Sequence, residues 1–434
     1  MKSYDWIVVG GGIAGIAIAE ILTREGHSVV LVEKNKKLAS VATREFHEWV
    51  HTGSLYTLVK DQMKTLKYIL GSLDDLLEFY SSFKNMNLSP SEKGLQIDQN
   101  KNGWFNKNYI DFKYRLKNRK FLLNWVYSVS RSIALIEGIR KHDWLRRRAG
   151  IIESVTSEYY LPILKNFFKI LFTNEKFLKI KSTDFTTNSR LLLRDLLSTS
   201  IKNGLEVLTE NELVKVENKG NEVIAHCKKG DLVGKKLAIC VGGGVEKFTS
   251  IKIKKSLAPI AVVKNVPPET KSFVELDYFK KTCINIITKG SSYGMIGGIS
   301  LSERKDAEKY FDYMIEEHKK SNPKLEVLEK YIGVKNEIIS RGENRNYIFH
   351  INNSLGNVVV SLSIDVNNSS FLSRINFVKL VQQNNSSNSK TQKLLAKWQK
   401  RQGRGPLRFR FCNWLVARGI GCNTLLQYIL QLFL

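Results

Sequence analysis

Three glycines and one acidic residue near the start of the chain have the types and the spacing to hold a dinucleotide. Gly10, Gly12 and Gly15 form the pattern Gly-x-Gly-x-x-Gly, and Glu33 follows 18 residues after the last of them. The first glycine permits a tight turn, the second lets the backbone approach a diphosphate, and the third lets a helix pack closely on a strand. A carboxylate at the position of Glu33 accepts the hydroxyl groups of an adenosine ribose.

The surrounding sequence supplies the elements that this motif needs. The apolar run 6–9 predicts a strand before the glycines, an apolar-periodic stretch to Arg24 predicts a helix after them, and 28–32 predicts a second strand that ends at Glu33. The helix N-terminus offers free N–H groups and a partial positive charge to phosphates. Because both strands, the helix and the acid occur in register, the sequence predicts a β-α-β dinucleotide-binding unit rather than a glycine-rich turn without a ligand.

Composition and charge limit the class of protein. The chain has 434 residues, which is enough for two domains. Its net charge of +27 favours anionic partners, such as a carboxylate or phosphate substrate, nucleic acid or a membrane surface, although a general lysine-rich bias explains the charge equally well. The five cysteines contain no Cys-x-x-Cys pair and indicate reduced thiols. Without a signal peptide or an apolar run of transmembrane length, we expect a cytoplasmic protein, with association at a membrane surface as the alternative.

Later segments are expected to add strands and a helix to the β-α-β unit and to form a second domain. A polar-capped helix from 187, an apolar strand at 236–241 and a final strand at 358–364 fit the first unit, whereas 257–302 alternates apolar and polar residues. The polar, Gly- and Asn-rich stretch 85–108 is expected to be an exposed loop.

The sequence therefore predicts an α/β fold. It comprises a Rossmann-like domain, whose central parallel sheet is interrupted in sequence, and a second α+β domain built on an antiparallel sheet. The expected extents are 1–80, 181–250 and 341–380 for the first domain, 81–180 and 251–340 for the second, and 381–434 for a linker and tail.

The tail is basic and aromatic from Lys390 and ends in the apolar run 425–434. This pattern favours peripheral membrane contact through residues 390–434 over a spanning helix. A helix docked on the body or on a partner, and a disordered tail that binds nucleic acid, are the alternatives. No RNA-binding motif accompanies the basic residues, so nucleic acid is not an expected partner.

Three stretches together resemble the FAD-dependent oxidoreductases of the D-amino-acid oxidase-like superfamily, and within it the L-2-hydroxyglutarate and flavin glycerol-3-phosphate dehydrogenases. One is the unit 7–33, and another is 51–56, which looks like the His-x-Gly-x-x-Tyr segment that passes the flavin in those members. The third is the order of a helix at 190–200, strands to Val216 and the run 238–243. The family's closing glycine-rich turn has no counterpart at 363–370, where the chain contains no glycine.

The resemblance implies an enzyme with FAD as its cofactor. Such an oxidase or dehydrogenase oxidises a CH–OH or CH–NH group of a small anionic substrate by hydride transfer to the flavin, which an electron acceptor or oxygen then reoxidises. His51 is the candidate for polarising the flavin or accepting a proton, and Arg44 and Tyr56 are candidates for contact with substrate or flavin. His47 would share a face with His51 if this stretch were helical, and no acidic residue is spaced to complete a metal site.

The cofactor-binding residues follow from the same comparison. Ser40 and Thr43 are expected to donate hydroxyl groups to the diphosphate, and the backbone at Val214 is expected to meet adenine. Arg374, after the last strand, is a candidate clamp for a carboxylate or phosphate. The full set of expected cofactor contacts is Gly10, Gly12, Gly15, Glu33, Lys34, Ser40, Thr43, Gly53, Val214 and Gly242.

Two other functions are compatible with the same residues. A flavoprotein monooxygenase or halogenase would use the reduced flavin to react with oxygen. A degenerate flavin-fold protein would serve as a binding or scaffold module through its basic tail.

Overall fold

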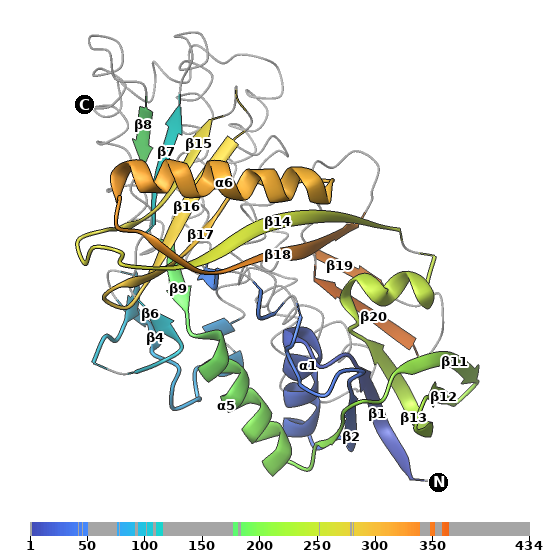
Figure 1. Ribbon diagram of the computed structural model, residues 1–434. Helices are drawn as coiled ribbons and strands as arrows, with labels where there is room; N and C mark the ends of the chain where they lie inside the picture. Colours follow the sequence, from blue (N-terminus) through green and yellow to red (C-terminus); the bar gives the residue numbers. More distant parts are fainter. Residues whose placement is uncertain are drawn as a thin grey trace, which may run out of the picture.

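The structure is a computed structural model. The residues that it describes are 2–41, 43–45, 47–50, 76–77, 79–91, 94–100, 102–106, 110–115, 177–180, 184–250, 252–277, 280, 282–338, 348–351 and 358–363. Their strands form two large sheets and two small ones, with two helices beside the first large sheet and a third helix on the second (Figure 1).

The N-terminal unit has the predicted β-α-β form. Strand β1 (Ser3–Val9) leads through the glycines into helix α1 (Ile13–Arg24), and strand β2 (Val29–Val32) returns parallel to β1. All four residues of β2 are buried, and so is α1 from Ala14 to Thr23. A strand and helix this apolar are covered on both faces, as expected at the centre of a parallel sheet.

The first sheet has the strand order β10-β2-β1-β13-β12-β11, and β20 extends the parallel part beyond β13. β19 pairs antiparallel with β20, and β11 and β12 form an antiparallel hairpin on β13. The predicted final strand therefore does return to this sheet, as β20. The bounds are β10 Glu206–Leu208, β11 Leu213–Lys219, β12 Glu222–Cys227, β13 Gly230–Ile239, β19 Ile348–Ile351 and β20 Val358–Ser363.

Helix α5 (Ser189–Lys202) packs beside α1 and begins as the sequence predicts. The Asn188 side chain caps it by accepting the N–H of Leu191. Gly204, at φ +91°, ends the turn that follows. A short 3-10 helix, η3 (Gly242–Lys247), begins at the second glycine turn, directly after β13.

The second sheet has the order β18-β14-β17-β16-β15-β7-β8. All its pairs are antiparallel except β7 with β15, which confirms the predicted antiparallel character of 257–302. Helix α6 (Arg304–Ser321) lies across one face and buries Phe311 and Met314 there (Figure 1). The bounds are β7 Ile110–Arg115, β8 Phe177–Ile180, β14 Ile253–Lys264, β15 Ser272–Asp277, β16 Thr282–Lys289, β17 Tyr293–Gly297 and β18 Glu326–Ile338.

For the described part of 85–108, the prediction of an exposed loop is wrong. Trp104 and Asn87 are buried. The Asn87 side-chain amide donates to the carbonyls of Phe105 and Asp98 and accepts the N–H of Phe105, so it satisfies backbone groups that would otherwise need water. Polar composition here serves internal hydrogen bonds rather than solvent. The short strands of this region and its neighbours are β3 Trp49–Val50, β4 Leu88–Ser91, β5 Gly94–Ile97, β6 Phe105–Asn106 and β9 Phe185–Thr187.

The strands of the first large sheet lie within the residues expected for the first domain, and those of the second large sheet lie within the residues expected for the second domain. The domain boundaries themselves stay a prediction. The tail 381–434 lies outside the described residues. None of the helices that the structure describes is both long and apolar enough to cross a membrane.

Candidate functional site

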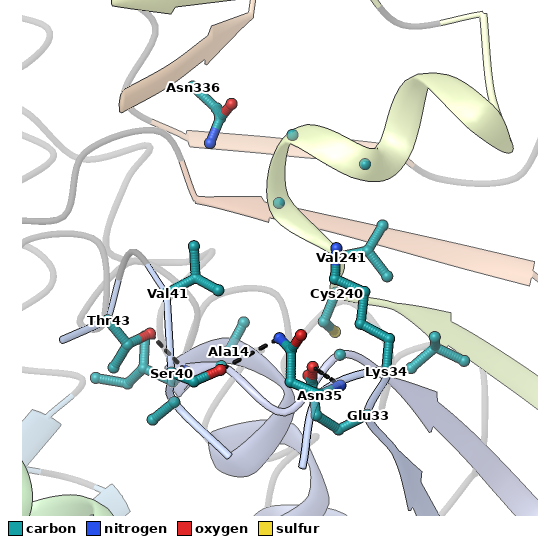
Figure 2. Close-up of a pocket in the computed structure, with 18 of the residues that line it drawn as sticks. Ala14, Glu33, Lys34, Asn35, Ser40, Val41, Thr43, Cys240, Val241 and Asn336 are labelled. Carbon is teal, nitrogen blue, oxygen red and sulfur yellow. Dashed lines mark hydrogen bonds between the residues drawn. The ribbon is translucent and has the colours of Figure 1, made fainter. Parts of the chain in front are cut away.

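A cavity of about 680 Å³ lies where the carboxyl ends of the parallel strands meet the second sheet. Val9, Val32 and Cys240, at the ends of β1, β2 and β13, line one side of it, together with the N-terminus of α1 (Figure 2). Val334 and Asn336 of β18 line another side. The volume is within the range of about 300–1,000 Å³ common for ligand pockets, and the position is the one at which open α/β sheets bind ligands.

The glycines of the motif have the geometry that a phosphate-binding turn requires. Gly10 has φ +105°, and a Cβ there would lie 2.4 Å from the Cys240 carbonyl oxygen. A Cβ at Gly15 would lie 1.9 Å from the Gly10 carbonyl oxygen, so only glycine lets α1 approach the turn. A Cβ at Gly12 would meet nothing closer than the Thr43 hydroxyl, at 3.4 Å. Gly12 therefore keeps the helix N-terminus open toward the cavity.

The N-terminus of α1 is free to attract an anion. The first turn carries no acidic residue, and Gly12 caps the helix without a side-chain hydrogen bond. Thr43 Oγ1 accepts the N–H of Ile13 at 3.2 Å. The other first-turn N–H groups have no intrahelical partner, and Gly12, Ile13 and Ala14 all line the cavity. The helix dipole adds positive potential at the same place.

Glu33 is held in one orientation at the end of β2. Its carboxylate accepts the N–H of Gly11 at 2.7 Å and the N–H of Asn35 at 2.8 Å. Asn35 in turn donates its side-chain amide to Ser40 Oγ at 3.2 Å (Figure 2). The Glu33 side chain is buried yet lines the cavity, so its remaining lone pairs are available to hydroxyl groups of a ligand.

Most of the cofactor contacts expected from the sequence gather around this cavity. Gly15 lies behind the turn, where it serves helix packing. Gly53 lies outside the described residues. The expected residues that line the cavity are Gly10, Gly12, Glu33, Lys34, Ser40, Thr43 and Gly242.

Val214, whose backbone is expected to meet adenine, lies next to the cavity lining rather than in it. It is the extra residue of a β-bulge, because the register of β11 against β12 shifts between Leu213 and Lys215. Its side chain is 60% exposed and does not line the cavity, whereas the buried side chain of Leu213 does.

The catalytic candidates are not assembled by the described residues. Arg44 is exposed and does not line the cavity. His51, Tyr56 and Arg374 lie outside the described residues. The stretch just before His51 is the strand β3 rather than a helix, so helical spacing does not relate His47 to it.

Several cavity residues were not identified from the sequence. Asn211 is buried, donates its backbone N–H to the Glu33 carbonyl and accepts the Lys229 N–H with its side chain. Lys255 and Asn336 come from the second sheet, and no local pattern marks them. The sequence does contain a signal for Glu48, because this acidic residue lies between the expected cofactor contacts 40–43 and the expected flavin segment 51–56.

Glu48 combines an unfavourable backbone with several partners. Its φ is +55°, which non-glycine residues rarely adopt. Its carbonyl accepts the Thr187 N–H, and its carboxylate accepts the N–H and hydroxyl of Ser189 and pairs with Lys289. Burial raises the pKa of this carboxyl, but Lys289 and Ser189 outweigh it and leave the pKa below its usual range. Glu48 is thus an anion on the cavity wall, held by the contacts that stabilise its backbone.

His47 packs against the second sheet beside Glu48. Its Cε1 and Nε2 would lie 2.5 and 2.7 Å from a Cβ at Gly297, so the imidazole occupies the space of the missing side chain. Burial, with the positive charges of Lys335 and Lys289, lowers the pKa of His47 to about 3. The imidazole is therefore neutral at physiological pH. Within the described ranges, no three His, Cys, Asp or Glu side chains are grouped so that they would hold a metal.

Comparison with known proteins agrees with this geometry. Residues 5–167 match the family model described as FAD dependent oxidoreductase (DAO). No curated protein matches the chain.

Solved structures with the same fold cover nearly the whole chain. The glycine oxidase from Geobacillus kaustophilus is similar with a TM-score of 0.62 and 11% identity, over 90% of this chain and 97% of that one. The L-alpha-glycerophosphate oxidase from Mycoplasma pneumoniae, solved with FAD bound, has a TM-score of 0.60 and 14% identity, over 87% and 94%. The L-proline dehydrogenase from P. horikoshii has a TM-score of 0.59 and 13% identity, over 89% and 95%.

These likenesses establish the fold and confirm the predicted α/β architecture. The part of the chain that the family model matches, residues 5–167, includes the glycine turn and Glu33. The similar structures include a glycine oxidase and an L-proline dehydrogenase beside the glycerophosphate oxidase. The comparisons therefore do not favour the hydroxyglutarate and glycerol-3-phosphate dehydrogenases over the amino-acid oxidases and dehydrogenases.

Proposed function

We propose that the protein is an FAD-dependent oxidase or dehydrogenase that removes a hydride from a CH–OH or CH–NH group of a small anionic substrate. One observation carries the proposal: Glu33 is fixed by two backbone N–H groups at the rim of a cavity that also contains the open N-terminus of α1. A ribose joined to a diphosphate requires this combination of acceptor and donors.

The residues around the turn fit FAD. A side chain at Gly12 would project toward Thr43 in front of the helix N-terminus, so its absence leaves a cradle for the diphosphate. The hydroxyl of Thr43 accepts from Ile13, and that of Ser40 accepts from Asn35, which leaves both hydroxyl protons free to donate to phosphate oxygens. When bound, FAD supplies the electron sink for hydride removal.

The charge of the cavity wall supports an anionic substrate. Each acidic residue of the lining is engaged by donors: Glu33 by backbone N–H groups, Glu48 by Lys289, Glu212 by Lys228 and Lys247, and Glu246 by the Ile253 N–H. By contrast, the lining residues Lys34 and Lys255 form no ion pair with any described residue. Together with Lys228, Lys247 and Lys289, which pair with acids of the lining, these two lysines give five positive charges against four carboxylates, and this excess favours a carboxylate or phosphate.

Flavin content is the first test. The purified chain is expected to show the two visible absorbance bands of oxidised flavin, or to acquire them when FAD is added. Glu33→Ala is expected to lose FAD affinity, whereas Glu25→Ala, which changes an exposed acid at the other end of α1, is the matched control. A wild-type protein that folds but binds no FAD contradicts the proposal and favours a binding or scaffold role.

The reaction class is tested by anaerobic titration. A panel of hydroxy acids, amino acids and their phosphate analogues is added to the FAD-loaded protein, and bleaching of the flavin absorbance is followed. At least one anionic member is expected to bleach the flavin, and its uncharged ester is expected to be slower. Reduction by NADH or NADPH alone, with no member of the panel active, contradicts the proposal in favour of a monooxygenase.

A further inference from the structure

Two polar residues of the second sheet face the cavity side by side. Lys255 on β14 and Asn336 on β18 are register partners in the antiparallel pair, so their side chains share one face of the sheet. Both line the cavity, as does Val334, two residues before Asn336. The intervening Lys335 and the neighbouring Lys254 do not, which agrees with the alternation of side chains along a strand.

We propose that Lys255 and Asn336 form an anion-binding subsite on the second sheet, which takes a phosphate or carboxylate group inside the cavity. The inference rests on the proposed function and adds to it a binding wall opposite the α1 N-terminus. Figure 2 shows Asn336 across the cavity from Glu33, Ser40 and Thr43.

The Asn336 amide lies against Gly243. A Cβ at Gly243 would lie 2.2 Å from Asn336 Oδ1 but 3.2 Å from Nδ2, so the amide oxygen is the atom nearer the glycine turn. The amide nitrogen is left on the cavity side (Figure 2). An amide nitrogen is a hydrogen-bond donor and cannot accept, which suits an anionic ligand.

Lys255 supplies the charge for this subsite. It is exposed, and it forms no ion pair with any residue that the structure describes. The four acids of the lining already have donors, as described above, so the ammonium of Lys255 is available to a ligand. A lysine beside an amide donor gives charge and direction together.

The anion at this subsite is either the diphosphate of the cofactor or the charged end of the substrate. The same chemistry recognises both. Separate probes distinguish them. Inorganic pyrophosphate and ADP report on the cofactor source in flavin-depleted protein, and inorganic phosphate and acetate report on the substrate source in FAD-loaded protein.

The test compares Lys255→Met and Asn336→Leu with wild type and with Lys254→Met. The control removes the same charge one residue away, on the other face of β14. Calorimetry gives the affinity of each probe, and thermal unfolding verifies that each variant folds. In one of the two arms, both cavity variants are expected to bind about tenfold more weakly, which corresponds to about 1.4 kcal/mol, and the control is expected to match wild type.

The pattern of weakening across the four probes decides between the outcomes. Weakening confined to pyrophosphate and ADP assigns the subsite to the cofactor, and weakening confined to phosphate and acetate assigns it to the substrate. Affinities within twofold of wild type for all four probes overturn it, as does an equal loss in Lys254→Met. If wild type binds pyrophosphate but not FAD, and Lys255→Met weakens pyrophosphate, the subsite stands while the proposed function fails.

Discussion

The ammonium of Lys289 lies 2.6 Å from the carboxylate of Glu48 and joins β16 of the second sheet to the loop before β3. The same carboxylate accepts from Ser189 at the start of α5. One side chain thus connects the second sheet, the loop of the cofactor site and a helix of the first domain. Glu48 and Ser189 line the cavity, so this contact lies at its wall.

Removing the positive charge of Lys289 is expected to destabilise the fold modestly. Lys289→Met leaves Glu48 with only Ser189 and should lower the free energy of unfolding by about 1 kcal/mol, since both side chains are about three-quarters buried. Urea unfolding measures the loss. Lys264→Met, which breaks the more exposed pair with Glu326 in the same sheet, is expected to cost less than about 0.5 kcal/mol. Equal losses in the two variants would contradict a special role for the Glu48 pair.

Two glycine substitutions are expected to separate folding from cofactor binding. In Gly15→Ala the new Cβ meets the Gly10 carbonyl, so α1 must shift and both stability and FAD affinity should fall. In Gly12→Ala the nearest atom is 3.4 Å away, so the fold should survive while the methyl group obstructs the helix N-terminus. We expect FAD affinity to fall at least tenfold in Gly12→Ala, with a melting temperature close to wild type. Flavin fluorescence and thermal unfolding give the two readouts.

Glu33→Gln tests the preorganised carboxylate. Both of its present partners, the N–H groups of Gly11 and Asn35, are donors, and a glutamine amide offers only one oxygen. One N–H therefore faces an NH₂ group, and we expect a loss of about 1–2 kcal/mol in unfolding free energy together with weaker FAD binding. Denaturant unfolding without FAD isolates the first effect. Unchanged stability would mean that the carboxylate is not held by these two donors.

The sequence predicts the N-terminal unit well because its determinants are local. The glycines, two apolar strands and Glu33 lie within one short stretch, and each acts through its own backbone or nearest neighbours. The opposite wall was not predictable, because Lys255 and Asn336 become neighbours only through the register of β14 with β18. The bulge at Val214 likewise depends on pairing with β12.

Composition misled the prediction where polar residues serve the interior. Asn87 belongs to a stretch that looks like a surface loop, yet its amide satisfies backbone groups beside the buried Trp104. A sequence pattern records the polarity of a side chain but not the partner that it finds after folding.

Buried histidines are expected to make the fold sensitive to mild acid. Burial lowers the pKa of His318 to about 4, and His47, as described above, shows a larger lowering with the same leading cause. The unfolded chain takes up protons near pH 6.5, whereas the folded chain does not until near pH 4, so stability falls as pH drops through this window. Each histidine contributes a slope of about 1.4 kcal/mol per pH unit there.

One buried acid has the opposite effect. Burial raises the pKa of Glu20 to about 7, although Arg24 opposes the shift. Between about pH 4.5 and 7, the folded chain therefore holds this proton while the unfolded chain releases it. The contribution of Glu20 to the free energy of unfolding falls as pH rises through this window. The contribution of Glu20 offsets roughly one of the two histidines, and a net loss of stability on acidification remains.

His318→Gln isolates one of these contributions. His318 Nε2 donates to the Asn285 carbonyl, and a glutamine amide can donate to the same oxygen without titrating. Urea unfolding at several pH values between 6.5 and 4.5 is expected to show a slope about 1 kcal/mol per pH unit smaller than that of wild type. His27→Gln, at a half-exposed position before β2, is the matched control. If His318→Gln keeps the wild-type slope, His318 takes up its proton in the folded state as readily as in the unfolded chain, and its burial does not govern the acid sensitivity.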